Sequence, residues 1–287
     1  MIKQLLQASS ITAAVLLTIA CSNQSSESPA NSAALDTPAF LKLYTLDCGT
    51  ITVSDLDGFA SSGDYAGLKG NLANTCYLIR HPQGDLLWDL GLAAALVGRG
   101  PQTNGVFTTS MEKTLSAQLS DLDIATDDID FIAISHSHFD HTGQVDQFPN
   151  SEWLVNGTEF EHMFATDESS LQNAAFSTLS TTTYSGDKDV FGDGSVVILA
   201  SPGHTPGHSV LQINLPQSGP LLLTGDLYHR TESRKSQLVP RFNTDEPQTR
   251  VSMTAFESLA TKLGARVIIQ HEPADIATLP KPPQFLQ

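Results

Sequence analysis

Residues 135–143 read Ser135-His136-Ser137-His138-Phe139-Asp140-His141-Thr142-Gly143, a stretch that holds three histidines and one aspartate within six residues. It follows residues 130–134, an apolar run with the length and β-branching of a buried strand. Side chains at positions i and i+2 of an extended backbone project to the same side, so His136 and His138 can converge on one metal ion. Asp140 and His141 follow a turn and can face a second position. Zinc prefers imidazole and carboxylate ligands, and iron, cobalt or manganese can accept the same set.

Three later segments also place ligand chemistry just beyond an apolar run. Residues 195–200 precede a segment that holds His204 and His208. Asp226 follows the run that begins at Leu221, and His271 follows the run that begins at Val267. Because four predicted strand ends carry metal-binding side chains, the pattern indicates one metal centre and not a polar loop that happens to hold histidines.

These segments together resemble the metallo-β-lactamase superfamily, which carries an HxHxDH stretch, a Pro-Gly-His-Thr segment, a Gly-Asp pair and a late strand-end histidine. Within this superfamily the chain is similar to the N-acyl-homoserine lactonases, particularly secreted or lipid-anchored bacterial members. The similarity runs over about residues 41–271 and includes residues 76–82, 87–89 and 225–229. It implies an α/β fold in which two stacked mixed sheets carry helices on their outer faces, an αββα sandwich.

The resemblance also implies two divalent metal ions, most simply zinc. It assigns His136, His138 and His204 to the first ion, Asp140, His141 and His271 to the second, and Asp226 to a position that bridges both. An anionic bridge suits two cations held about 3.5–4 Å apart, which otherwise repel one another. Asp89 is expected to support a ligand histidine, and His208 is expected to support the site without binding metal.

The implied chemistry is hydrolysis of an activated carbonyl. Metal binding lowers the pKa of water from 15.7 towards about 7, so a hydroxide that bridges the two ions can attack a lactone carbonyl. The resulting oxyanion is stabilised electrostatically, and Asp140 is expected to pass a proton to the leaving alkoxide. Many family lactonases carry a tyrosine three residues after the bridging aspartate; here that position is His229, with Tyr228 one place earlier. Either residue could donate a hydrogen bond to the substrate, and core packing is an equal alternative for Tyr228.

We therefore expect a binuclear hydrolase that opens the lactone ring of N-acyl-homoserine lactones, which would silence these signals (quorum quenching). A formal charge of −16 disfavours nucleic acid as a partner and fits a small neutral substrate. Only 16 residues follow His271, too few for the glutathione-binding region of glyoxalase II. Asp226 argues against a zinc β-lactamase, which usually lacks a bridging acid. The alternatives are a hydrolase of another small ester, lactone or β-lactam, and a metal-binding protein without catalysis.

The N-terminus has the pattern of an export signal. Lys3 precedes residues 11–20, an apolar stretch too short to span a bilayer, and Cys21 follows a small residue. We expect residues 1–20 to be a signal peptide and residues 21–38 to be a flexible tether after a lipidated Cys21. Residues 39–287 would then form one catalytic domain of a periplasmic or outer-membrane-anchored lipoprotein that meets the membrane only through its lipid.

Several local expectations concern the remaining chain. Cys48 and Cys76 could pair in an oxidising compartment, but we expect buried free thiols because both lie beside apolar runs. Residues 250–263 predict an amphipathic helix with Val251 facing inward. The other expectations are two separate strands at residues 41–46 and 49–53, a glycine-rich loop at 56–71 bordering the active site, a loop at 98–109 that carries Phe107, and an irregular segment at 166–185.

Overall fold

The computed structural model describes residues 40–287. The signal peptide and the tether predicted from the sequence lie outside these residues. Within the described part, no helix is both long enough and apolar enough to cross a membrane.

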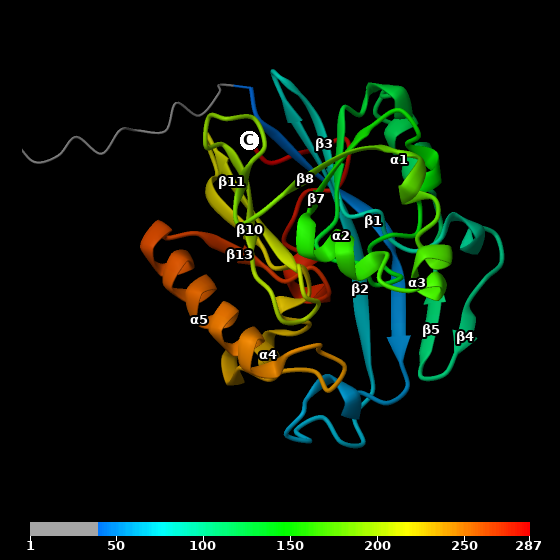
Figure 1. The fold of residues 1–287 in the computed structure, drawn as a ribbon, viewed down its shortest axis with the longest axis vertical. Helices are drawn as coiled ribbons and strands as arrows, with labels where there is room; N and C mark the ends of the chain where they lie inside the picture. The colour runs from blue at the N-terminus through cyan, green and yellow to red at the C-terminus, as the bar shows by residue number, and fades with distance from the viewer. Residues whose placement is uncertain (1–39) are drawn as a thin grey trace, which may run out of the picture. The chain divides into compact units, whose positions relative to one another are not determined.

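A larger sheet of eight strands forms one half of the fold (Figure 1). Its strand order is β4-β5-β1-β2-β3-β6-β7-β8. Neighbouring strands are antiparallel from β4 to β3, and the pairs β3–β6, β6–β7 and β7–β8 are parallel. The strands are β1 (Lys42–Val53), β2 (Gly70–His81), β3 (Gly84–Trp88), β4 (Gln102–Asn104), β5 (Phe107–Ser110), β6 (Phe131–Ala133), β7 (Glu152–Asn156) and β8 (Ser180–Tyr184).

A smaller sheet of five strands in the order β13-β12-β11-β10-β9 packs against the first. Its members are antiparallel except for the parallel pair β12–β13. The strands are β9 (Lys188–Asp189), β10 (Val196–Ala200), β11 (Ser209–Leu215), β12 (Gly219–Leu223) and β13 (Arg266–Ile268).

The inner strands of both sheets are apolar on both faces, so the molecule builds three core layers. Ile79 and Leu86 of the large sheet meet Leu211 and Leu223 of the small one between the sheets. Their sequence neighbours point the other way: Leu78 and Leu87 pack under α1 and α2, and Leu222 packs under α5. This period-2 alternation with both sides buried is what a two-sheet sandwich with outer helices requires. The predicted αββα sandwich is confirmed.

Helices cover the two outer faces, with α5 over the small sheet and α1 and α2 over the large one (Figure 1). The α-helices are α1 (Leu115–Ser120), α2 (Gly157–Met163), α3 (Asp167–Gln172), α4 (Thr231–Ser236), α5 (Glu246–Leu263) and α6 (Pro273–Ile276). Short 3₁₀ helices are η1 (Asp57–Phe59), η2 (Ala94–Leu96), η3 (Thr126–Asp128), η4 (Val145–Gln147), η5 (Phe176–Thr178) and η6 (Gly225–Leu227).

The long helix α5 is placed by its caps and by its apolar face. The Asp245 carboxylate accepts a hydrogen bond from the Gln248 N–H at the start, and Gly264 ends the helix with a φ of 60°. The prediction that Val251 faces the core is wrong, since 61% of this residue is exposed. The buried face lies on the turns beside it, at a spacing of three or four residues: Thr249, Ser252, Met253, Phe256 and Ala260.

Three predicted segments differ from the structure. Residues 42–53 form one strand with a register shift between Asp47 and Gly49, where two strands were expected. The expected loop at 98–109 contains the hairpin β4–β5, and the expected irregular segment at 166–185 contains α3 and β8. β4 and β8 are the two edges of the large sheet, and β5 lies next to one of them. Their polar, Thr-rich sequences lack the apolar alternation that marks a buried strand.

The expectation of free thiols is also wrong. Cys48 and Cys76 form a disulfide with their Cα atoms 5.8 Å apart. Cys76 pairs in register with Leu46, so the bond joins neighbouring strands β1 and β2 at the register shift. Both cysteines are fully buried, as predicted, but strand pairing brings them together across 28 residues, which local sequence does not reveal.

Removing this disulfide should lower stability without touching the metal-binding residues. For a closed loop of this length, loop-closure entropy accounts for about 3–4 kcal/mol of unfolding free energy. We expect the Cys48→Ala, Cys76→Ala double variant to lose at least that much in urea-induced unfolding and to keep its bound metal. An unfolding free energy equal to that of the wild type would show that the crosslink contributes nothing to stability.

Candidate metal centre

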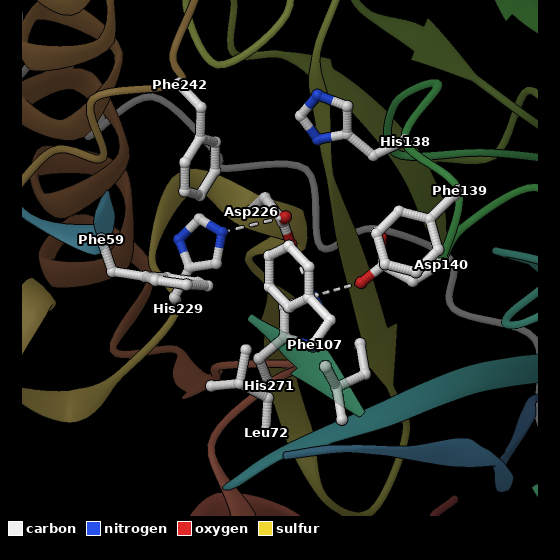
Figure 2. A pocket seen from close by; sticks show the side chains of 11 residues that line it. Phe59, Leu72, Phe107, His138, Phe139, Asp140, Asp226, His229, Phe242 and His271 are labelled. Atoms are coloured by element: carbon white, nitrogen blue, oxygen red, sulfur yellow. Dashed lines mark ion pairs between the residues drawn. The ribbon is translucent and has the colours of Figure 1, made fainter. Parts of the chain in front are cut away.

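The candidate ligands come from four loops, each of which follows a strand. His136, His138, Asp140 and His141 lie beyond β6, and His204 lies between β10 and β11. Asp226 lies in the 3₁₀ turn after β12, and His271 lies three residues beyond β13. Figure 2 shows five residues of this centre and its pocket wall (His138, Asp140, Asp226, His229 and His271) facing one cavity.

The side chains gather in two adjacent clusters. His136, His138, His204 and Asp226 each offer one ligand atom within 4.8 Å of the others, and so do Asp140, His141 and His271. The sequence prediction assigned the six flanking residues to the same two groups and placed Asp226 between them as a bridge. Both clusters fit a divalent metal ion, because each combines imidazole nitrogens with carboxylate oxygen.

Asp226 joins the clusters through its two carboxylate oxygens. Oδ2 lies 3.5 Å from His136 Nε2 and 3.3 Å from His204 Nε2. Oδ1 lies 3.3 Å from His141 Nε2 and 2.9 Å from His271 Nε2. One oxygen therefore faces each cluster, so each could bind a cation held there.

Hydrogen bonds at the far ring nitrogens set the tautomers of three histidines. Nδ1 of His204 donates to Asn243 Oδ1 at 2.8 Å, because an amide oxygen can only accept. For the same reason, Nδ1 of His271 donates to the Ala73 carbonyl at 2.6 Å, and Nδ1 of His141 donates to Asp89 Oδ2 at 3.0 Å. In the neutral rings, Nε2 is left with a lone pair that points into the clusters, as metal ligation requires.

Two further observations fit bound cations. His138 Nδ1 lies 2.9 Å from His136 Nε2 and 3.0 Å from His204 Nε2, so three ring nitrogens point at one another. Asp226 Oδ1 is buried and has no hydrogen bond of good geometry among the described residues. Burying ring-nitrogen lone pairs that face one another, together with an unsatisfied carboxylate oxygen, costs free energy unless a cation lies between these groups.

The protonation behaviour of the first cluster also suits metal. Burial lowers the pKa of His136 well below its usual value. Burial and the neighbouring His204 lower the pKa of His138 to about 3. Both rings are therefore neutral at neutral pH, and neutral imidazole is the form that binds a metal ion.

The second cluster is more strongly anionic. Burial opposes a charge on His141, but Asp89, Asp226 and Asp140 outweigh it and raise the pKa of this histidine well above its usual value. Burial likewise opposes ionisation of Asp226, yet His271 and His229 hold the pKa of its carboxyl well below the usual range. This cluster therefore favours positive charge, which a dication supplies.

Asp89 supports the ligands from beneath, as expected. It is 1% exposed and has a φ of 60°. Besides holding His141, it accepts hydrogen bonds from the Ser135 N–H at 2.6 Å and from Gln270 Nε2 at 2.8 Å. Gln270 was not identified from the sequence, although its place next to His271 was a usable signal.

His208 supports Asp226, and neither of its ring nitrogens is free to bind a metal ion. Its Nδ1 donates to the Ser201 carbonyl at 2.9 Å, so its Nε2 accepts the Asp226 N–H at 3.0 Å. Both ring nitrogens are used, and the backbone of Asp226 is anchored.

The structure separates the two candidates for substrate contact. Tyr228 is fully buried and packs under α5, where its ring centroid lies 6.0 Å from that of Phe256. It is not part of the pocket wall. His229 lines the pocket, and its Nε2 lies 3.1 Å from Asp226 Oδ2 (Figure 2). Core packing is therefore the reading that the structure favours for Tyr228.

A cavity of about 270 Å³ opens above the clusters. His138, Asp140, Asp226, His229 and His271 contribute its polar groups. Its apolar wall comes from residues far apart in the sequence. Phe59 belongs to the loop that was predicted to border the site, and Phe107 belongs to the segment that was predicted as a loop. Sequence reasoning missed Phe242. The apolar residues are Ile51, Phe59, Leu72, Phe107, Phe139 and Phe242.

A two-sheet sandwich that carries two His/Asp clusters joined by one carboxylate defines a class of binuclear metal-dependent hydrolases. The chain belongs to the metallo-β-lactamase superfamily, whose family model matches residues 70–271. N-acyl homoserine lactonase AttM of Azorhizobium caulinodans is 28% identical over 263 residues, covering 85% of this chain and 98% of that protein. N-acyl homoserine lactonase AiiA of Bacillus thuringiensis subsp. kurstaki is 30% identical over 207 residues, covering 69% and 80%.

Solved structures agree with the sequence relatives. An N-acyl homoserine lactone hydrolase with the product N-hexanoyl-L-homoserine bound at its catalytic metal centre superposes with a TM-score of 0.75 at 26% identity. The match covers 85% of this chain and 98% of that one. The resemblance to the N-acyl-homoserine lactonases is confirmed.

Proposed function

We propose that the protein hydrolyses the lactone ring of N-acyl-homoserine lactones. The observation that carries this proposal is the Asp226 carboxylate placed between two histidine-rich clusters at the floor of an apolar-walled cavity. Relatives over most of the chain are named as lactonases of this substrate class. A related structure holds the ring-opened product at its metal centre.

We propose zinc for both ions. The first cluster offers three imidazoles and a carboxylate, and the second offers two imidazoles with Asp140 and a share of Asp226. Such nitrogen and oxygen donors suit four-coordinate zinc. When bound, a pair of these ions polarises a carbonyl oxygen and makes water acidic enough to act as a nucleophile at neutral pH.

The protein's own groups would bind the substrate and move its proton. The phenylalanine wall suits an acyl chain and excludes water, while the polar floor suits the lactone. Asp140 lines the cavity, with its Oδ2 3.5 Å from His271 Nε2, and can pass a proton to the alkoxide that leaves as the ring opens. His229 faces the same space and can hydrogen-bond the substrate.

A hydrolysis panel tests this assignment against its alternatives. Acyl-homoserine lactones should be turned over faster than simple esters, β-lactams and thioesters. A preference for β-lactams or another ester would reassign the substrate within the same chemistry. Two bound metal ions without turnover of any substrate would instead favour a metal-binding protein without catalysis.

We further propose that the chain is exported and anchored through lipidated Cys21, on the basis of the short apolar stretch and the Ser-rich segment after it. The Cys21→Ser variant should no longer partition into the membrane fraction, whereas the wild type should. Mass spectrometry of the wild-type N-terminus should find a lipid on Cys21. An unmodified chain with Met1 retained would contradict this proposal.

A further inference from the structure

Glu159 is a buried carboxylate that the function proposed above does not use. It lies on α2 and is 1% exposed. Among the described residues it forms no ion pair, so no neighbouring cation compensates its burial by direct contact. A buried carboxylate is costly unless hydrogen-bond donors surround it, and the identity of those donors shows what the residue holds.

All three donors belong to the two loops that carry the histidines of the first cluster; the loop after β6 also carries Asp140 and His141 further along. Oε1 accepts the Ser137 N–H at 2.8 Å, the backbone group between His136 and His138. Oε2 accepts the hydroxyl of Thr205, which directly follows His204, at 2.7 Å, and the N–H of Gly207, two residues later, at 2.9 Å. One oxygen thus binds the loop after β6, and the other binds the loop between β10 and β11.

Close packing makes this junction rigid. A Cβ atom on Gly207 would lie 2.3 Å from the Glu159 nitrogen and 2.6 Å from its Cβ, so the His204 loop lies directly on the α2 backbone. Thr205 is 1% exposed. The loops therefore have little freedom to turn away if the carboxylate is present.

We propose that Glu159 is a positioning residue for the first metal site: by joining the two loops, it sets the angle at which the ring nitrogens of His136, His138 and His204 converge. It makes no such contact with Asp140, His141 or His271. Residues that orient metal ligands typically change metal affinity 10–100-fold when replaced. The inference rests on the proposed metal centre, but not on the identity of the substrate.

The Glu159→Gln variant keeps the shape and removes the charge. Its amide has one accepting oxygen, so its NH₂ group must face at least one of the three donors. We expect affinity for the first zinc ion to fall about 10–100-fold in competition with a chelator, while the second ion is retained. The matched control is Glu161→Gln, an exposed carboxylate on the same helix, which should bind both ions as the wild type does.

Combining Glu159→Gln with variants that lack one of the two metal sites shows which site it weakens. With His271→Ala, which leaves the first cluster intact, Glu159→Gln should lower the affinity of the remaining ion. With His136→Ala and His138→Ala, which leave the second cluster intact, it should not. The visible spectrum of cobalt-loaded protein should report the changed geometry of the first site only.

The Thr205→Val variant removes one donor with little change in volume, and tests the same junction if Glu159→Gln fails to fold. It should lower affinity at the first site by a smaller factor. Wild-type affinity for both ions in either folded variant, or an equal loss at both sites, would overturn the proposal. Failure of the wild type to open lactones while binding two ions would overturn only the proposed function.

Discussion

Asp226→Ala is expected to abolish lactone hydrolysis, with a loss of at least about 10³-fold in kcat/KM. Removing one electrostatic stabiliser from an active site costs 10²–10³-fold, and Asp226 serves two clusters at once. Its Oδ2 lies 3.3 Å from His204 Nε2 and its Oδ1 lies 2.9 Å from His271 Nε2. Without this carboxylate, two cations would repel each other across a gap with no anion.

Metal analysis and kinetics of the same sample check this prediction. The variant should bind fewer than two ions per chain, and Asp226→Asn should also be impaired because it keeps the shape but not the charge. Asp146→Ala, which removes an exposed aspartate from η4, shortly after the loop that carries His136 and His141, is the matched control. Turnover of Asp226→Ala within tenfold of the wild type would show that the bridge is not needed.

Removing the metal ions should abolish turnover and lower the stability of the whole domain. A ligand present at 100 times its Kd adds about 2.7 kcal/mol to the unfolding free energy, so two such ions contribute about 5 kcal/mol. The metal-free protein must also keep Asp226, which is 3% exposed, among histidine nitrogens that no longer bind a cation.

Urea unfolding before and after chelation measures this effect. Activity and stability should return together when zinc is added back, and chelator already saturated with zinc should have neither effect. Equal unfolding free energies for the metal-loaded and metal-free protein would contradict the account, because ions that bind only the folded state must stabilise it.

The ligand set could be predicted from the sequence because its signals are local. His136 and His138 are two residues apart at a strand end, and Asp226 and His271 each follow an apolar run. The alternation that buries Leu78 on one face and Ile79 on the other is likewise written in neighbouring residues. Such patterns require no knowledge of which strands pair.

What could not be predicted depends on pairing between distant segments. The disulfide forms because β1 lies beside β2. The polar strand β4 exists only because it pairs with β5 at the edge of the sheet. Phe59 and Phe242 meet with ring centroids 5.2 Å apart, although more than half of the chain separates them in sequence. Glu159 carries no motif of its own, and its role becomes visible only when its three donors are known.

The most direct test of the central claim is the mass of the product formed from N-hexanoyl-homoserine lactone by the zinc-loaded protein. Ring opening predicts a single product that is heavier than the substrate by one water, with its amide intact. Acidification should close the ring again and restore the original mass. Release of hexanoic acid together with free homoserine lactone would mean that the amide is cleaved, and would contradict the account.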